Sequence, residues 1–297
     1  MSDRDSSVYY GALEAGGTKF ICALGDAQGD LHASTRLETR DPQATLAAVE
    51  RWFQEITPPG ATLRALGVGA FGPLDLTPGS ARFGWITTTP KPGWRDTDLA
   101  GRLGRALGCP VRIDTDVNAA ALAELRWGAG RGLASLAYVT VGTGIGAGIV
   151  HHGVPVHGML HPELGHVRVR RHPQDAHFEG ICPFHGDCLE GLASGPAIVA
   201  RSGRRLEQAP AGHPIWTIES DYLGQLCALL VLSHSPHRIV LGGGVMQAGL
   251  YPSIHERMRY WLGGYIASPA LQEATYVGPP GLGGESGVRG ALALALG

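Results

Sequence analysis

Blocks of like charge are absent from the sequence. The 297 residues carry 24 Lys plus Arg and 26 Asp plus Glu, which gives a formal net charge of −2. This balance argues against general nucleic-acid binding and gives no sign of attraction to a membrane surface. No apolar run reaches the length of a membrane-spanning helix. The first ten residues, MSDRDSSVYY, lack a basic region followed by an apolar one, so we predict no signal peptide and expect a cytoplasmic protein.

Cysteine and lysine are also scarce. Five cysteines are an odd and low number, which argues against a disulfide framework and agrees with a reducing compartment. Three of them, Cys22, Cys109 and Cys227, lie in apolar stretches and are expected to be buried thiols. Only two of the 24 basic residues are lysines, Lys19 and Lys91, and both fall in loops punctuated by glycine or proline. Their rarity singles them out, although chance explains it as well.

The length of the chain predicts about two domains with a large buried core. Each half of the chain opens with a strand, a glycine turn and a second strand, first over Tyr9 to Leu24 and again over Leu136 to Val150. The pattern therefore repeats after about 130 residues, and helical segments follow each hairpin. We predict an α/β protein of two similar lobes, which leaves a cleft between the turns if the lobes face each other.

Hydrophobic periodicity predicts the elements between and after these hairpins. Helices are expected where apolar residues recur every three or four positions, and strands where short apolar runs end at turn-forming residues. The expected helices cover 42–56, 99–107, 117–127, 223–234 and 251–262, and the further strands cover 31–39, 66–71, 111–113 and 238–241.

Three glycine-rich turns follow apolar strands, at Glu14 to Thr18, Gly142 to Gly148 and Gly242 to Gly244. Glycine lets backbone N–H groups approach phosphate oxygens directly, so three such turns favour a nucleotide clamp over a purely structural role. The second turn fits the loose pattern G-x-G-x-x-A, but a strand and not a helix follows it, which excludes a Rossmann site. No G-x4-G-K-[ST] motif is present, which excludes an ordinary P-loop.

The segment Asp114 to Asn118, DTDVN, joins an apolar strand to a helix. A carboxylate at the carboxyl end of a strand can act as a general base in a cleft. Helix capping is the alternative, because Asp and Asn are favoured caps. Two aspartates and an asparagine exceed what one cap needs, so we expect one of these residues to cap and one to act.

Cys182, His185 and Cys188 are spaced C-x2-H-x2-C, and His166 lies upstream of them. Two thiolates and two imidazoles suit Zn²⁺ in a closed, structural site. A Cys182–Cys188 disulfide or ordinary surface residues are the alternatives, and neither explains the two histidines. Glu163 and Glu190 bracket the cluster, so a metal would position two carboxylates; as the alternative, both are solvated loop charges.

Eight motifs occur in order along the chain: EAGGTKF, GAFGPLD, TPKPGW, DTDVNAAALAE, VTVGTGIGAGI, HPELGH, CPFHGDCLEGLASGPAI and VLGGGV. Together they resemble the ROK family of sugar kinases, and most closely its zinc-containing fructokinase branch, from about Tyr9 to Gly297. The resemblance implies the actin/hexokinase-like ATPase fold, with two RNase H-like lobes and a cleft between them. The small lobe is expected over 1–117, completed by the C-terminal helix 286–297. The large lobe is expected over 118–285, with the zinc-binding loop at 161–190.

The resemblance also implies a role for each matching residue. Asp116 is implied to be the general base that takes the proton from the sugar hydroxyl. The residues implied to hold the other hydroxyls are Asn118, Glu163, His166 and Glu190. The residues implied to border ATP are Gly16, Gly17, Thr18, Lys19, Gly142, Thr143, Gly144, Gly243 and Gly244. The implied zinc ligands are His166, Cys182, His185 and Cys188. His166 then has two tasks, because one ring nitrogen can bind metal while the other donates to a sugar oxygen.

The activity that follows from the resemblance is transfer of phosphate from ATP, with Mg²⁺, to the 6-hydroxyl of D-fructose. A kinase for glucose, mannose or an N-acetylhexosamine is the nearest alternative. A sugar-responsive transcriptional regulator is disfavoured, because only about eight residues precede the first strand, and a non-catalytic sugar binder is disfavoured by the intact Asp116. The family commonly forms homodimers.

The sequence departs from the common patterns in three places. Glu14 stands where the wider fold commonly has Asp, a departure that the fructokinase branch shares, and Thr115 stands where many relatives have Asn. Gly284 to Gly287 replaces a more common Asp-Asn pairing near the C-terminal helix.

Overall fold

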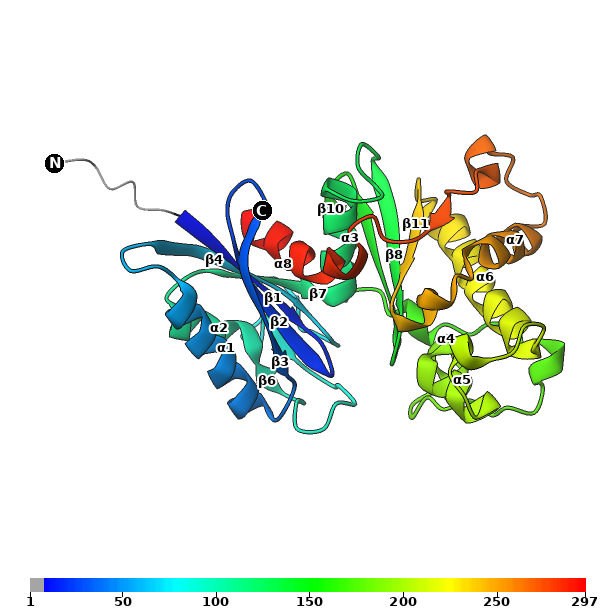
Figure 1. Cartoon of the computed structure of the whole chain (residues 1–297), viewed down its shortest axis with the longest axis horizontal. Helices are drawn as coiled ribbons and strands as arrows, with labels where there is room; N and C mark the ends of the chain where they lie inside the picture. Colours follow the sequence, from blue (N-terminus) through cyan, green and yellow to red (C-terminus); the bar gives the residue numbers. More distant parts are fainter. Residues whose placement is uncertain (1–7) are drawn as a thin grey trace. The chain divides into compact units, whose positions relative to one another are not determined.

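The structure is a computed structural model that describes residues 8–297, which form two compact units, each built on its own five-stranded sheet (Figure 1). Unit 1 extends to Glu124 and also contains Pro155–His161 and Gly284–Gly297. Unit 2 comprises Leu125–Val154 and Pro162–Gly283. The expectation of no signal peptide falls mainly on residues 1–7, which lie outside the described residues.

The sheet of unit 1 has the order β3-β2-β1-β4-β7. Its strands are β1 (Val8–Ala15), β2 (Lys19–Gly25), β3 (Leu31–Glu38), β4 (Thr62–Ala70) and β7 (Val111–Thr115). Antiparallel pairing joins β1 to β2 and β2 to β3, and parallel pairing joins β1 to β4 and β4 to β7. The short strands β5 (Trp85–Ile86) and β6 (Thr97–Asp98) form a separate antiparallel pair.

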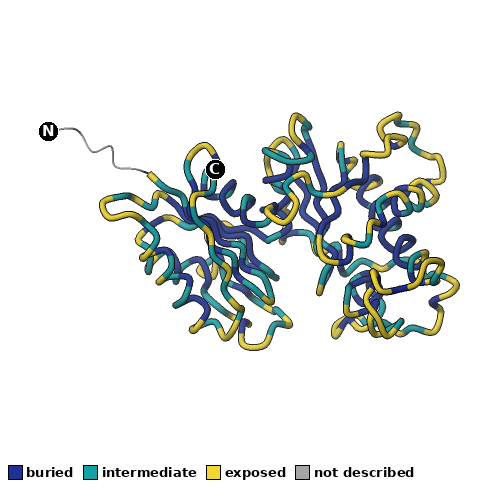
Figure 2. Tube along the Cα trace, viewed as in Figure 1, coloured by how far each residue is buried: buried dark blue, intermediate teal, exposed yellow. Residues whose placement is uncertain are grey.

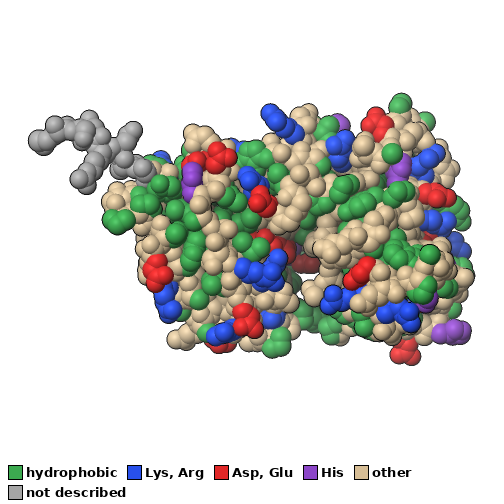
Figure 3. All heavy atoms as spheres, in the orientation of Figure 1, with side chains coloured by type: hydrophobic (Ala, Val, Ile, Leu, Met, Phe, Trp, Pro, Cys, Tyr) green, Lys and Arg blue, Asp and Glu red, His purple; other side chains and the backbone are tan. Residues whose placement is uncertain are grey.

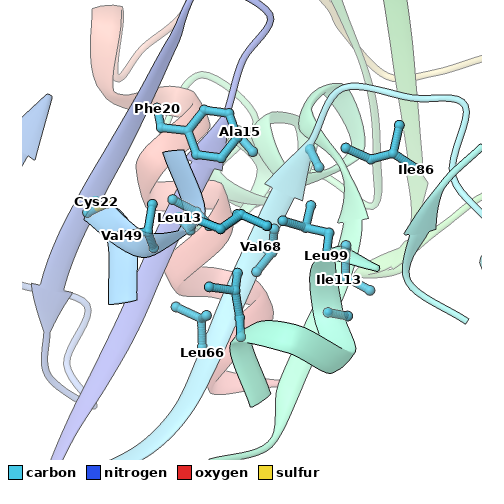
Figure 4. Packing of buried hydrophobic residues seen from close by; sticks show 14 of the residues in the cluster. Leu13, Ala15, Phe20, Cys22, Val49, Leu66, Val68, Ile86, Leu99 and Ile113 are labelled. Atoms are coloured by element: carbon cyan, nitrogen blue, oxygen red, sulfur yellow. The ribbon is translucent and has the colours of Figure 1, made fainter. Parts of the chain in front are cut away.

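Helices cover both faces of this sheet. The helices of unit 1 are α1 (Pro42–Ile56), α2 (Leu99–Leu107), α3 (Asp116–Arg126, which crosses into unit 2) and α8 (Ser286–Leu296). Side chains of a strand point alternately to opposite faces. Leu13 and Phe20 therefore pack with α1 and α2 (Figure 4), whereas Ala12 and Ala23 pack with α8. The sheet is therefore buried on both sides, which fixes the end of β7 and the start of α3.

Local sequence explains why α1 and α2 begin where they do. The Asp41 carboxylate accepts a hydrogen bond from the backbone N–H of Ala44, and Pro42 occupies the first helical turn. Asp98 caps α2 in the same way through Gly101, and Gly108 ends that helix with a φ of 64°. The helices expected over 42–56 and 99–107 are confirmed.

The sheet of unit 2 has the order β10-β9-β8-β11-β12. Its strands are β8 (Ser135–Val141), β9 (Ile145–His151), β10 (Val154–Pro155), β11 (Ile239–Gly242) and β12 (Val277–Gly278). As in unit 1, an antiparallel hairpin is followed by two strands that add in parallel. The repeat predicted from the glycine-turn hairpins is confirmed by this shared strand order.

Four helices belong to unit 2: α4 (Leu189–Ala193), α5 (Gly195–Ser202), α6 (Pro214–His234) and α7 (Tyr251–Leu262). Helix α6 is long and apolar enough to cross a membrane by composition alone, but 72% of that stretch is buried, as in a core helix (Figure 2). The apolar face starting at Leu223 predicted a later start for this helix. The helix begins at Pro214 because the side chain of His213 caps it.

Basic and acidic side chains are interspersed on the face of the molecule seen in Figure 3.

Candidate active site and metal centre

The first glycine turn joins β1 to β2. The backbone N–H of Gly16 donates to the carbonyl of Lys19 at 2.9 Å, and the Thr39 hydroxyl donates to the carbonyl of Gly16 at 2.8 Å. These bonds hold the base of the turn, while Gly17 and Thr18 at its tip are partly or fully exposed. A fixed turn with accessible backbone amides can bind phosphate oxygens.

The junction of β7 and α3 carries the segment DTDVN. Asp114 is 4% exposed, and its Oδ1 accepts from the backbone N–H of Thr115 at 2.7 Å and from Nδ2 of Asn118 at 2.8 Å. The Thr115 hydroxyl oxygen accepts from the backbone N–H of Asn118 at 3.1 Å, which is the bond of a helix cap. The expectation that one of the two aspartates or the asparagine caps this helix is therefore wrong, because Thr115 makes the capping bond and Asp114 holds the Asn118 side chain.

Asp116 is the first residue of α3 and is partly buried. Desolvation raises the pKa of its carboxyl to about 7, and the carboxylate of Glu14 acts in the same direction. A hydrogen bond from the backbone N–H of Val117 at 2.9 Å opposes the shift. A carboxyl group poised near neutral pH is suited to accept a proton from a hydroxyl group.

Glu14, at the end of β1, is an acidic residue that we did not predict as part of the site. Its Oε2 atom is buried and has no hydrogen-bond partner among the described residues. Desolvation raises the pKa of Glu14, and the charge of Lys19 opposes this. The departure of this position from the Asp common in the wider fold was the only signal in the sequence.

His157 is a second residue that sequence reasoning missed. Its Nε2 lies 3.0 Å from Oδ2 and 3.1 Å from Oδ1 of Asp114, and 3.3 Å from Nδ2 of Asn118. The hydrogen bond to Asp114 raises the pKa of His157. The two residues are 43 positions apart in the chain, so no local spacing connects them.

In unit 2 the second glycine turn is tied to Glu190. The backbone N–H of Gly142 donates to the carbonyl of Gly144 at 2.9 Å, and Oε2 of Glu190 accepts from the backbone N–H of Ile145 at 2.9 Å. A Cβ at Gly144 would lie 2.7 Å from this carboxylate oxygen, so a side chain there would displace the Glu190 carboxylate. Thr143 at the tip is exposed. One carboxylate thus joins the turn to the start of α4.

The predicted metal ligands converge in unit 2. One ligand atom from each of His166, Cys182, His185 and Cys188 can be chosen so that all lie within 4.8 Å of one another. Nδ1 of His166 lies 3.5 Å from Sγ of Cys188 and 3.8 Å from Sγ of Cys182, and Nδ1 of His185 lies 3.6 Å from Sγ of Cys182. Tetrahedral zinc with ordinary Zn–S and Zn–N bonds requires ligand separations of about 3.3–3.8 Å, which these distances match.

Both cysteines of the cluster are free thiols and buried, so the disulfide alternative is not observed. His166 ends a short 3₁₀ helix, Leu164–His166, and Glu163 immediately precedes this helix and is exposed. Because Nδ1 of His166 faces the thiols, its Nε2 is the ring nitrogen left for another contact.

A buried ion pair, which no local sequence pattern indicated, anchors the chain between His166 and Cys182. Nε of Arg201 donates to Oδ1 of Asp175 at 2.7 Å, and the Tyr222 hydroxyl donates to Oδ2 at 2.7 Å. The Arg201 and Asp175 side chains are 9% and 2% exposed. The pair therefore attaches the loop to α5 and α6.

The third glycine turn follows β11. Gly243 has a φ of 93°, and Gly244 begins the 3₁₀ helix Gly244–Ala248. The predicted site residues are thus divided between the units. Unit 1 holds Gly16, Gly17, Thr18, Lys19, Asp116 and Asn118. Unit 2 holds Gly142, Thr143, Gly144, Glu163, His166, Cys182, His185, Cys188, Glu190, Gly243 and Gly244.

The chain matches the model of the ROK family over residues 10–297. It is 44% identical to a fructokinase of Zymomonas mobilis over 291 residues, which covers 97% of this chain and 96% of the relative. It is 42% identical to a fructokinase of Pediococcus pentosaceus over 286 residues, which covers 96% of each. Among solved structures it resembles a ROK family glucokinase from Streptomyces griseus in complex with glucose and AMPPNP, with a TM-score of 0.76, 25% identity and coverage of 97% and 99%. The expected hexokinase-like α/β fold is confirmed.

Proposed function

The chain belongs to the ROK family, and we propose that it is an ATP-dependent kinase that phosphorylates the 6-hydroxyl of D-fructose to give fructose 6-phosphate. The observation that carries this proposal is the identity of 42–44% with two fructokinases over nearly the whole of each chain. The partly buried Asp116, with a pKa of about 7, supplies the base that such a reaction uses.

Asp116 is proposed to accept the proton of the attacking sugar hydroxyl. Phosphoryl transfer depends mainly on alignment of the two oxygens and on neutralisation of the phosphate charge. Asn118, Glu163, His166 and Glu190 are proposed to bind the other hydroxyls of the sugar. Asn118 offers a buried Oδ1 acceptor, and His166 offers the ring nitrogen that does not face the thiols.

The glycine turns are proposed to bind the nucleotide. The Gly16–Lys19 and Gly142–Gly144 turns would contact the terminal phosphates, and Gly243 and Gly244 would flank the adenosine. ATP is proposed to bind with Mg²⁺, which neutralises phosphate charge when bound. Glu14 fits such an ion, because it is a carboxylate with a buried, unpartnered oxygen next to the first phosphate turn.

A structural zinc ion is proposed at His166, Cys182, His185 and Cys188, which would place the chain in the zinc-containing branch. The separations of the ligand atoms and the two buried free thiols support it. The ion would order the loop that carries Glu163 and Glu190. A cytoplasmic homodimer is the proposed state of the protein.

Identification of the product tests this function. The purified protein is incubated with MgATP and fructose, and the product is analysed by ³¹P NMR against authentic fructose 1-phosphate and fructose 6-phosphate. Fructose 6-phosphate is expected. Fructose 1-phosphate, or no phosphorylated sugar, would contradict the proposal.

A further inference from the structure

Both oxygens of the buried Asp114 carboxylate have hydrogen-bond partners within unit 1. Oδ1 accepts from the backbone N–H of Thr115 and from Nδ2 of Asn118, and Nε2 of His157 lies within hydrogen-bonding distance of both oxygens. A carboxylate can only accept, so the His157 ring nitrogen that faces it carries the proton and donates. Asp114 therefore has little capacity left for a substrate or for a transferred proton, unlike Asp116.

These bonds decide which way the Asn118 side chain faces. The amide nitrogen is the donor to Asp114, so the amide cannot turn over without placing its oxygen against a carboxylate. Oδ1 of Asn118 is consequently left as an acceptor, and it is buried without a hydrogen-bond partner among the described residues. The residue is only 1% exposed. A buried acceptor without a donor costs free energy, which a ligand hydroxyl group can recover.

His157 stabilises this arrangement from the other side. Its side chain is 37% exposed and comes from the segment Pro155–His161, which belongs to unit 1 with β7 and α3. The donation from Nε2 adds a further hydrogen bond to the Asp114 carboxylate, and a charged acceptor holds the Asn118 amide more tightly than a neutral one does. Asp114 and His157 thus act on the substrate only through Asn118.

We propose that Asp114 and His157 are positioning residues that fix the Asn118 amide with Oδ1 presented as the acceptor for a sugar hydroxyl group, and so help to select the sugar. This inference rests on the proposed kinase function and extends it. The reaction gains no new chemical step, because the three residues only bind and orient. Their contribution belongs to sugar affinity and not to the transfer of phosphate.

Exchange of the two side chains tests the orientation directly. Asp114→Asn removes the charged acceptor, and Asn118→Asp places two carboxylates side by side, so each change is expected to raise the sugar KM about 10-fold or more, the equivalent of about 1.4 kcal/mol. The double variant D114N/N118D restores a donor at 114 and an acceptor at 118. Its sugar KM is expected to return to within about 3-fold of the wild-type value.

His157→Ala is expected to raise the sugar KM about 3- to 10-fold, with kcat and the KM for ATP changed by less than about 3-fold. His157→Gln, which keeps a donor, should lose less. His32→Ala is the matched control, because Nε2 of His32 lies 2.7 Å from Oδ2 of Asp26 in the same unit and outside the site. The control variant should keep both KM values.

Sugar is also titrated calorimetrically into each variant in the absence of ATP. This measures sugar binding separately from turnover. Weaker binding in the single variants and recovery in the double variant support the inference. Unchanged binding in D114N and H157A, or a double variant worse than both single variants, overturns it and leaves the proposed function intact. A wild-type protein that neither binds nor phosphorylates any hexose overturns both.

Discussion

The carboxyl group of Glu14 lies against Gly287, the second residue of α8. A Cβ at position 287 would come within 2.4 Å of Cδ and 2.5 Å of Oε2 of Glu14, closer than side chains pack. Glu14 stands where the wider fold commonly has Asp. The additional methylene group of Glu14 thus occupies the space that a side chain at 287 would need. The position of the Glu14 side chain and the glycine at 287 are therefore coupled.

Gly287→Ala should displace Glu14 while leaving α8 intact. Alanine favours the helix by up to about 1 kcal/mol, so the thermal midpoint should not fall much, whereas turnover should drop about 10- to 100-fold because the acid beside the first phosphate turn moves. Glu14→Asp shortens the acid and makes room for the added methyl group. The fold-loss of turnover in E14D/G287A should therefore be smaller than the product of the fold-losses in the two single variants. Gly284→Ala, where nothing lies within 4 Å of the added Cβ, is the control and should be neutral. A loss in the double variant equal to the product of the two single losses would disprove this coupling.

Asp116 should make turnover depend on pH near neutrality. Burial raises its pKa to about 7, so the carboxyl is protonated and inactive as a base below that pH, and kcat should rise with pH through about 7. Asp116→Asn should lower kcat by roughly 100-fold or more and abolish this rise. Steady-state rates between pH 5.5 and 8.5, with circular dichroism to verify folding, measure both effects. A folded D116N protein with near-normal turnover would remove Asp116 from this role.

Cys182→Ser should abolish metal binding. Loss of one thiolate breaks the proposed closed site, whose binding energy would contribute to folding. The variant should therefore carry less than one zinc per chain and unfold at a lower temperature than the wild-type protein. Cys109→Ser, which changes a buried thiol in the other unit, is the control and should retain the metal. Zinc content by plasma mass spectrometry decides the question. Stoichiometric zinc in C182S would refute the ligand assignment.

The buried pair of Asp175 and Arg201 should matter far more for stability than an exposed pair. Asp175→Asn leaves the Arg201 charge buried without its partner, which should cost about 3 kcal/mol of unfolding free energy. Glu38→Gln breaks the exposed pair with Arg40, whose side chains are 70–71% exposed, and should cost less than about 0.5 kcal/mol. Denaturant titration compares the two. Equal losses would show that the Asp175 pair does not anchor the loop.

Sequence patterns could predict those features that are local in the chain. The two glycine-turn hairpins, the capped helix at 42–56 and the C-x2-H-x2-C cluster each depend on spacings of a few residues, and all three are present. Contacts between distant positions gave no such signal. His157 meets Asp114 only because the segment Pro155–His161 belongs to unit 1. Asp175 meets Arg201 only because the loop between His166 and Cys182 folds onto α5. The capping role of Thr115 was missed because Asp, Asn and Thr are all acceptable caps, so composition alone could not choose among them.

The most direct measurement of the central claim is a coupled ADP-release assay with MgATP against fructose, glucose, mannose and N-acetylmannosamine. We predict the highest kcat/KM for fructose. Each hydroxyl contact that another sugar fails to make should cost on the order of 1 kcal/mol, or roughly 5-fold in kcat/KM. A clear preference for another sugar would contradict the fructose assignment while keeping the kinase mechanism. No ADP release with any of the four, from a folded and zinc-loaded protein, would contradict the kinase account itself.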